Sequence, residues 1–279
     1  MTDPTLDRTA LTTALFEEWD AIAALVTDID ENRWRTPTAL PGWSVFDTLA
    51  HVAGVESWLL GERPPAHDQA TEKVDVSTLP HVRNQTGVLN EIWVDRLRPL
   101  PGAQLLELFG DVVGRRRKAL SAMGEPEWQT ETPSPIGQVS YGRFMRVRLF
   151  DCWMHELDIA DALGVRVDEG GRRGELAFAE FLGSVPRVVV KKGGAPDGSR
   201  ITFAVTGALA RPLHIQVAGR ASFVDAFDEP ATVEIQLPSE LFVRLGGGRT
   251  TADEHLDQIA ITGDEQLGLQ LVRNLAFTL

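Results

Sequence analysis

The stretch of the chain that decides its fold is RFMRVRLFDCWMHELDIADALG, residues 143–164. Apolar side chains recur in it at the spacing of an amphipathic helix: Phe144, Val147, Phe150, Met154, Leu157 and Ala160. Asp151 and His155 lie four residues apart, so they share one face of this helix and could hold one ion between them. Such a site needs a third ligand from elsewhere in the chain, and His51 is the best candidate.

The helix that carries His51 is expected to begin at Ser44. Ser44 is a favourable N-cap residue, and Asp47 stands at the third helical position, where a carboxylate helps the exposed N–H groups. The buried stripe of this helix is formed by Val45, Leu49, Val52 and Leu59. His51 lies at the edge of that stripe, one turn beyond Asp47, so its ring can point into a helix bundle.

Helical spacing extends over much of the N-terminal half. We expect further helices over residues 6–30, 84–97 and 104–123, and loops over residues 32–43, 61–80 and 125–140. A loop as long as the one over residues 61–80 often acts as a lid or a substrate wall. Long helices joined by loops, two of them with inward polar residues, predict a four-helix bundle with a site in its core.

The sequence pattern changes after residue 164. Alternating apolar residues predict strands in ITFAV (201–205), LHIQVAG (213–219) and ATVEIQL (231–237). Helices are expected over residues 175–185, 238–245 and 265–276, and a hinge or tight loop over residues 191–199. The sequence therefore predicts a helical domain over residues 1–170, followed by a smaller α+β domain over residues 171–279.

The composition is ordinary for a globular protein, with 43% hydrophobic and 24% charged residues in a chain of 279. The net charge of −13 argues against a nucleic-acid or anionic-membrane partner, because both need a basic face. No apolar run approaches the roughly 20 residues of a membrane span, and the N-terminus has no apolar signal region. A cytoplasmic location is therefore expected, while the choice between a monomer and a homodimer stays open.

Two imidazole nitrogens and one carboxylate oxygen are a common zinc ligand set that leaves one coordination position open. With one carboxylate, the site would carry a formal charge of about +1, which favours hydroxide or a thiolate as the fourth ligand. A bound metal lowers the pKa of its water to about 7 and deprotonates a coordinated thiol, and either product is a nucleophile at neutral pH. From spacing alone, however, an Asp and a His four residues apart are more often a surface pair.

The neighbours of this pair have open roles. Cys152, the only cysteine, excludes an internal disulfide and a cysteine-rich zinc site, and a buried inert thiol is its favoured interpretation. Asp158 is either a carboxylate that orients the imidazole of His155 or a solvated residue. Arg148 is placed either to hold a substrate carboxylate or to form a salt bridge to Asp151, and the two readings are equally favoured.

Two of these segments resemble a known family. LPGWSVFDTLAHVAGVESW (40–58) and RVRLFDCWMHELDIADALG (146–164) resemble the mycothiol-dependent maleylpyruvate isomerase family, within the DinB/YfiT-like superfamily. PSELFVRLGGGR (238–249) and ITGDEQLGLQLV (261–272) resemble the C-terminal domain of that family, which has a sterol-carrier-protein-like fold. The resemblance implies a DinB-like four-helix bundle followed by a sterol-carrier-like α+β domain.

The resemblance also implies a metal triad of His51, Asp151 and His155. The characterised isomerase pattern has Glu where this chain has Asp151, so the ligand is chemically equivalent but one methylene shorter. This departure bears on the specific isomerase activity more than on metal binding. Zinc is the favoured ion, and nickel, cobalt and manganese are the alternatives.

Members of this family use the metal to bind and ionise a low-molecular-weight thiol, which is mycothiol in actinobacteria. The resemblance implies that the thiolate attacks an electrophilic small molecule, giving either S-transfer or cis–trans isomerisation of the maleylpyruvate type. Mycothiol and a small electrophile are therefore the expected partners. The alternatives are a metal-dependent hydrolase that activates water with the same triad, and a non-enzymatic ligand-binding or stress-response protein.

One arginine and two tryptophans are further candidates for the site. Arg249 follows three glycines and could reach an anion as a catalytic residue, although a turn-stabilising role is at least as favoured. Trp43 and Trp58 could pack against a substrate or brace the helix that carries His51. The position of Trp43 beside an N-cap favours the structural role for it.

Overall fold

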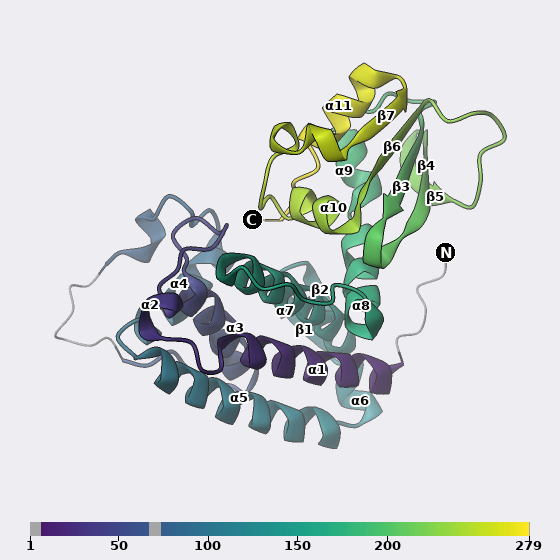
Figure 1. Cartoon of the computed structure of the whole chain (residues 1–279). Helices are drawn as coiled ribbons and strands as arrows, with labels where there is room; N and C mark the ends of the chain where they lie inside the picture. The colour runs from purple at the N-terminus through teal and green to yellow at the C-terminus, as the bar shows by residue number, and fades with distance from the viewer. Residues whose placement is uncertain (1–6, 67–73, 279) are drawn as a thin grey trace. The chain divides into compact units, whose positions relative to one another are not determined.

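The structure, a computed structural model, describes residues 7–66 and 74–278. The chain divides into two compact units, Met1–Val167 and Asp168–Leu279, each with its own core (Figure 1). The expected domain limit at residue 170 lies close to this division. Among the helices of the described residues, none is long and apolar enough to cross a membrane.

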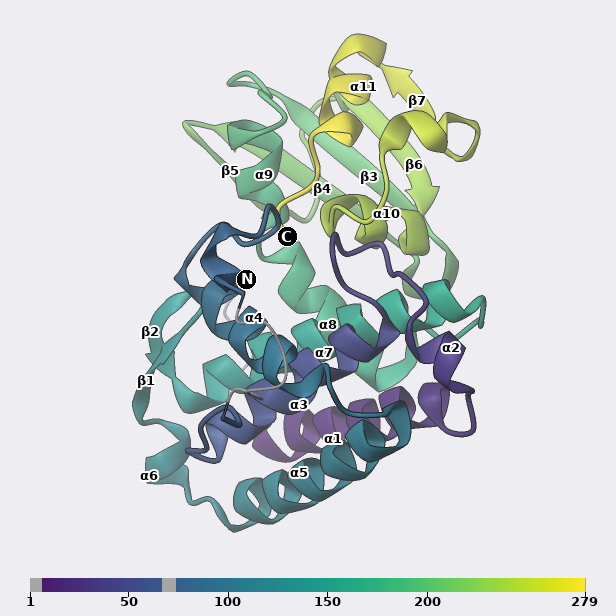
Figure 2. The same ribbon diagram turned by 90° about the vertical axis from the view of Figure 1, so that its left-hand side faces the viewer.

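Four long helices form the first unit: α1 (Arg8–Val26), α3 (Val45–Leu59), α5 (Gly102–Ala122) and α7 (Tyr141–Leu163). α1 and α3 each pack against both α5 and α7, so the four helices close into a bundle (Figure 2). A further helix, α4 (Gln85–Leu97), packs against α3. The predicted four-helix bundle is confirmed, and each long helix lies close to its expected position.

Short elements fill the connections of the bundle: α2 (Glu31–Trp34), the 3-10 turn η1 (Val76–Thr78), α6 (Glu125–Trp128), β1 (Glu131–Ser134) and β2 (Gly137–Ser140). The prediction of a loop over residues 125–140 was wrong, because α6 and an antiparallel hairpin occupy it. The hairpin turn is closed by Ser134, whose hydroxyl donates to the carbonyl of Gly137 at 2.7 Å. Residues 67–73 of the predicted loop over residues 61–80 lie outside the described part of the chain.

α3 begins where the sequence predicts. The hydroxyl of Ser44 accepts from the backbone N–H of Asp47 at 3.3 Å, and Asp47 Oδ2 accepts from the backbone N–H of Ser44 at 2.9 Å. This reciprocal capping box fixes the first turn and therefore the position of His51 two turns along. Later in α3, Gly54 lets the helix approach Trp93 of α4 closely.

α7 lies against α1, α3 and the hairpin. It begins after the N-cap Ser140 and ends at Gly164, which adopts a left-handed conformation with φ of 66°. Most of the predicted stripe is buried, whereas Val147 and Phe150 are partly exposed. The buried surface extends beyond that stripe to Met145, Leu149, Cys152, Trp153 and Ile159.

The second unit is a mixed sheet with helices: α8 (Gly171–Leu182), α9 (Val185–Lys191), β3 (Arg200–Thr206), β4 (Arg211–Ala218), β5 (Arg220–Val224), β6 (Val233–Pro238), α10 (Ser239–Gly246), β7 (Ala260–Gly263) and α11 (Glu265–Arg273). Short 3-10 turns lie at η2 (Gly207–Leu209), η3 (Ala252–Glu254) and η4 (Leu256–Gln258). The strand order is β5-β4-β3-β6-β7, with β3 and β6 parallel and the other pairs antiparallel.

The α+β class of this unit and its three predicted strands are confirmed, but two edge strands, β5 and β7, were missed. Neither edge strand has the clean alternation of buried residues that β4 and β6 show. The helix expected over residues 175–185 is two helices, which meet at Gly183 and Ser184. The core is an aromatic cluster of Phe178, Phe181, Phe203 and Phe242.

The contact between α3 and α4 gives a test of the packing. We expect Gly54→Ala to lower the free energy of unfolding by about 1–3 kcal/mol, because the added Cβ would lie 2.6 Å from Cβ of Trp93. Gly110→Ala on α5 is the matched control, since a Cβ there meets nothing within 4 Å and helix propensity alone should stabilise by up to about 1 kcal/mol. Urea unfolding of both variants measures the difference, and equal effects would contradict the packing described.

Candidate metal centre

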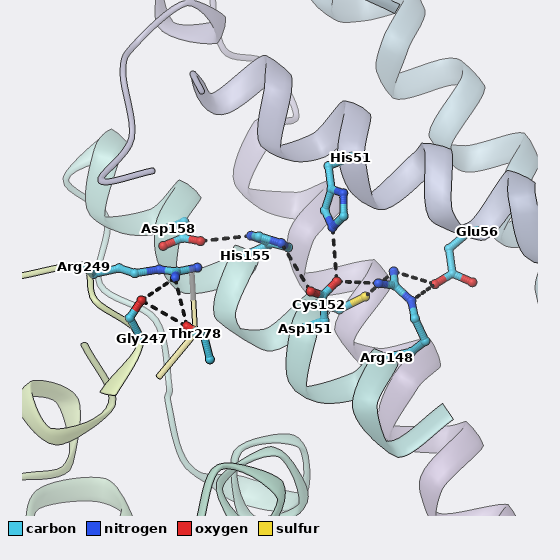
Figure 3. A network of polar contacts seen from close by, with 10 residues as sticks. All are labelled: His51, Glu56, Arg148, Asp151, Cys152, His155, Asp158, Gly247, Arg249 and Thr278. Atoms are coloured by element: carbon cyan, nitrogen blue, oxygen red, sulfur yellow. Dashed lines mark hydrogen bonds and ion pairs between the residues drawn. The ribbon is translucent and has the colours of Figure 1, made fainter. Parts of the chain in front are cut away.

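The three predicted ligands come together inside the first unit. His51 projects from α3, and Asp151 and His155 project from α7 (Figure 3). One donor atom from each of them lies within 4.8 Å of the other two. Both histidines are buried, and the Asp151 side chain keeps 35% of its exposure, so the cluster opens to its surroundings on the side of the carboxylate.

The spacing of the donor atoms fits one ion. His51 Nε2 is 3.3 Å from Asp151 Oδ2, and His155 Nε2 is 3.7 Å from Asp151 Oδ1. A tetrahedral zinc ion about 2.0–2.2 Å from nitrogen and oxygen ligands separates those ligands by roughly 3.3–3.6 Å. The aspartate, although one methylene shorter than the glutamate of the family pattern, reaches both histidines.

The protonation states also suit a metal ligand set. Burial alone would raise the pKa of Asp151, but Arg148 and the two histidines together lower it well below its usual range. Burial lowers the pKa of His51, and its hydrogen bond to Asp151 opposes this only in part. An anionic carboxylate and a neutral imidazole are the forms that bind a divalent ion.

The two histidines are held in different ways. His155 Nδ1 is 2.9 Å from Oδ2 of Asp158, which leaves Nε2 facing Asp151. Asp158 is buried, so it orients His155 and is not the solvated residue that was the alternative. His51 Nδ1 is also buried but has no hydrogen-bond partner among the described residues, and the indole of Trp43 packs against its ring.

Arg148 connects Asp151 to a buried carboxylate that the sequence reading missed. Its Nη1 pairs with Asp151 Oδ2, while Nε and Nη2 donate to Glu56 Oε1 at 3.1 and 2.9 Å. The other oxygen of Glu56 accepts from Nε of Arg116 at 2.8 Å. The salt bridge to Asp151 that was one of the two readings of Arg148 is therefore present, and binding of a substrate carboxylate stays a prediction.

The sequence around Glu56 does indicate a buried carboxylate. It lies in the second half of α3, within a run from Val45 to Ser57 that is almost wholly buried. A carboxylate inside such a run indicates a buried ion pair, because an unpaired charge is very rarely buried. Its two arginine partners lie 60 and 92 residues away along the chain, so the pattern could not name them.

The other predicted residues lie as follows. Cys152 is fully buried, and burial raises the pKa of its thiol well above the usual value, as expected of an inert thiol. Arg249, in the second unit, donates through Nη1 to the carbonyl of Gly247 at 2.6 Å and to the hydroxyl of Thr278 at 3.3 Å. This is the turn-stabilising role, and anion binding by Arg249 stays a prediction. Trp58 is 45% exposed.

Comparisons with known proteins cover both units of the chain. The profile of the mycothiol maleylpyruvate isomerase N-terminal domain matches residues 15–160, and that of the C-terminal domain of the same family matches residues 175–270. The chain belongs to the mycothiol maleylpyruvate isomerase family. The resemblance seen in the sequence is thereby confirmed for both units of this family member.

A crystal structure of the mycothiol-dependent maleylpyruvate isomerase shares this fold with a TM-score of 0.58 and 18% identity, covering 92% of this chain and 93% of the other. A histidine-to-alanine variant of the same enzyme matches equally well, at 17% identity. Uncharacterised proteins of two Mycobacterium tuberculosis strains are 28% identical over 150 residues, which is 53% of this chain and 54% of theirs. The chain thus spans about half the length of the curated relatives it matches.

The buried ion pairs behind the centre give a stability test. We expect Glu56→Ala to lower the free energy of unfolding by about 3–5 kcal/mol, because it removes the carboxylate that pairs with the buried Arg116 and one of the two carboxylates that pair with the buried Arg148. Glu62→Ala is the matched control, since Glu62 also pairs with an arginine of α5, Arg115, but at a partly exposed position, where the loss is at most about 1 kcal/mol. Denaturant unfolding of both variants compares them, and a small loss in each would argue against the ion-pair chain.

Proposed function

We propose that this protein binds one divalent metal ion through His51, Asp151 and His155 and uses it in a thiol-dependent reaction on an electrophilic small molecule. The observation that carries the proposal is the convergence of two imidazoles and one anionic carboxylate at spacings that suit a single ion. The donor set contains no thiolate from the chain and suits zinc, and nickel, cobalt and manganese accept the same donors.

Mycothiol is the thiol that family membership suggests. A divalent ion bound here would lower the pKa of a coordinated thiol, so that its thiolate is available at neutral pH. The reaction on the electrophile would then be cis–trans isomerisation of the maleylpyruvate type or, as the alternative, S-transfer. Both begin with attack of the thiolate on an electrophilic carbon of the small molecule.

Three residues around the centre orient the proposed ligands. Asp158 holds the proton of His155 at Nδ1 and so keeps Nε2 free for the ion. Arg148 keeps Asp151 anionic and aimed at the two histidines, while Glu56 anchors Arg148 from behind. A substrate carboxylate could reach Arg148 only by displacing one of these carboxylates, so we favour a positioning role for this arginine.

Metal content tests the ligand set directly. Protein purified without chelator should contain about one divalent ion per chain, and His51→Ala and His155→Ala should each reduce this content to near zero, because only two ligands remain. His214→Ala is the control, since His214 lies in the second unit against Thr202 and should retain the ion. Elemental analysis gives the stoichiometry, and a full complement of metal in both site variants would sink the assignment.

Thiol dependence tests the reaction class. With maleylpyruvate as the probe, turnover should require added mycothiol, and Asp151→Asn should lower kcat/KM at least about tenfold, because loss of the charge weakens metal binding. Circular dichroism checks that the variant is folded. Turnover at the same rate without thiol would contradict the proposal and favour the hydrolase, in which the ion activates water.

A further inference from the structure

Trp43 lies against both histidines of the candidate metal centre. Its ring centroid is 5.1 Å from that of His51 and 6.3 Å from that of His155, and the two imidazoles are 4.9 Å apart. The indole therefore forms a wall beside both rings. His51 has more need of it, because Asp158 already holds His155, whereas Nδ1 of His51 has no hydrogen-bond partner among the described residues.

The indole is itself held through its N–H by Glu91 of α4. Trp43 Nε1 donates to Glu91 Oε2 at 2.8 Å, and Nε2 of His81 lies 3.0 Å from the same oxygen. The other oxygen, Oε1, is paired with Nη2 of Arg98 at 2.7 Å. Glu91 is fully buried, so this carboxylate has its partners within the protein and not in the solvent.

Arg98 also connects this network to the start of α3. Arg98 Nε donates to Asp47 Oδ1 at 2.9 Å, and Asp47 is the capping-box residue of the helix that carries His51. Gly42, with φ of 80°, lets the preceding loop lie against His81, because a Cβ there would approach that ring to 2.8 Å. The loop that presents Trp43 and the first turn of α3 are therefore both fastened to α4.

This arrangement does more than neutralise a buried carboxylate. An uncompensated charge in the interior is strongly destabilising. Arg98 already compensates the charge of Glu91 through its ion pair with Oε1. The hydrogen bond at Oε2 is charge-assisted and directional, so it fixes the indole in its plane, whereas apolar contact alone would leave the ring free to slide. Outer groups that fix the orientation of ligand rings are part of many metal sites, and here a packed indole is placed to do this for His51.

We propose that Glu91 is a positioning residue of the metal centre, which holds the indole of Trp43 against the ligand rings. Through Trp43 it steadies His51, whose Nδ1 has no hydrogen-bond partner in the described part of the chain, much as Asp158 steadies His155. The inference rests on the proposed function, because the centre that Glu91 serves is the metal site postulated there.

The contact itself is tested on the full-length metal-free protein by NMR of ¹⁵N-labelled indoles. Trp43→Phe identifies the Nε1–H signal of Trp43 by its loss. Glu91→Ala should move that signal upfield and speed its exchange with water at least about tenfold, because the charged acceptor is lost. Glu91→Gln, which keeps a neutral acceptor and is the variant closer to the native fold, should give an intermediate result.

Asp95→Asn is the matched control for this measurement. Asp95 is another carboxylate of α4 and pairs with Arg96 at 3.9 Å, so its loss should leave the indole signal in place. A Trp43 signal that is unchanged in both Glu91→Ala and Glu91→Gln would overturn the proposal. A Trp43 signal that shifts in Glu91→Ala and Glu91→Gln but not in Asp95→Asn would support it.

The consequence for the site is tested by zinc affinity, measured in competition with a chelator. Glu91→Ala and Trp43→Phe should each raise Kd about tenfold, in the range typical of groups that orient metal ligands. In the double variant, Glu91→Ala should raise the Kd of Trp43→Phe by less than about threefold, because Glu91 no longer has the indole N–H through which it acts on His51. Effects that multiply would mean that Glu91 acts only on the fold, and would overturn the proposal.

Failure of the proposed function would look different. Wild-type protein that binds no zinc would overturn the metal site and, with it, the role of Glu91 in that site. The indole signal would still report whether Glu91 holds Trp43, since that measurement uses no metal.

Discussion

The guanidinium of Arg148 is the group on which the geometry of the candidate metal centre rests. It joins Asp151, the proposed carboxylate ligand on α7, to Glu56, a fully buried carboxylate on α3. Arg116 of α5 completes the chain by pairing with the second oxygen of Glu56. These ion pairs connect three helices of the bundle, and the chain of ion pairs ends at Asp151, a predicted ligand. Because unpaired buried charges are costly, this geometry has few low-energy alternatives.

The second constraint acts on the histidines, which receive different kinds of support. Asp158 lies one turn along α7 and fixes His155 by a local hydrogen bond. Nδ1 of His51 has no hydrogen-bond partner among the described residues, and its ring packs against the indole of Trp43, which belongs to a network anchored on α4. His51 is therefore coupled to α4, whereas Asp158 holds His155 from within α7. Substitutions in α4 should reach the site mainly through His51.

Local patterns in the sequence predicted the elements that local physics determines. Periodicity predicted the long helices, and the four-residue spacing of Asp151 and His155 predicted their shared face. The hairpin within residues 131–140 was missed, because two strands of four residues carry too little alternation to show. The networks around Glu56 and Glu91 join residues 48 to 92 positions apart, and such pairs leave no periodic trace. The convergence of His51, Asp151 and His155 was thus predictable from sequence, but the groups that hold them were not.

The charge balance of the centre favours an anionic fourth ligand. Arg116 and Arg148 cancel Glu56 and Asp151, so the buried ion-pair chain is neutral as a whole. Asp151 therefore has little negative charge left over to offset a divalent ion, and the remaining carboxylate beside the histidines is Asp158. With neutral histidines, an added ion would leave a net charge of about +1 in a buried setting. A positive charge in such surroundings is poorly screened, so it favours an anion at the open coordination position over a neutral ligand. A thiolate or a hydroxide meets that requirement as it binds, whereas a neutral substrate oxygen does not.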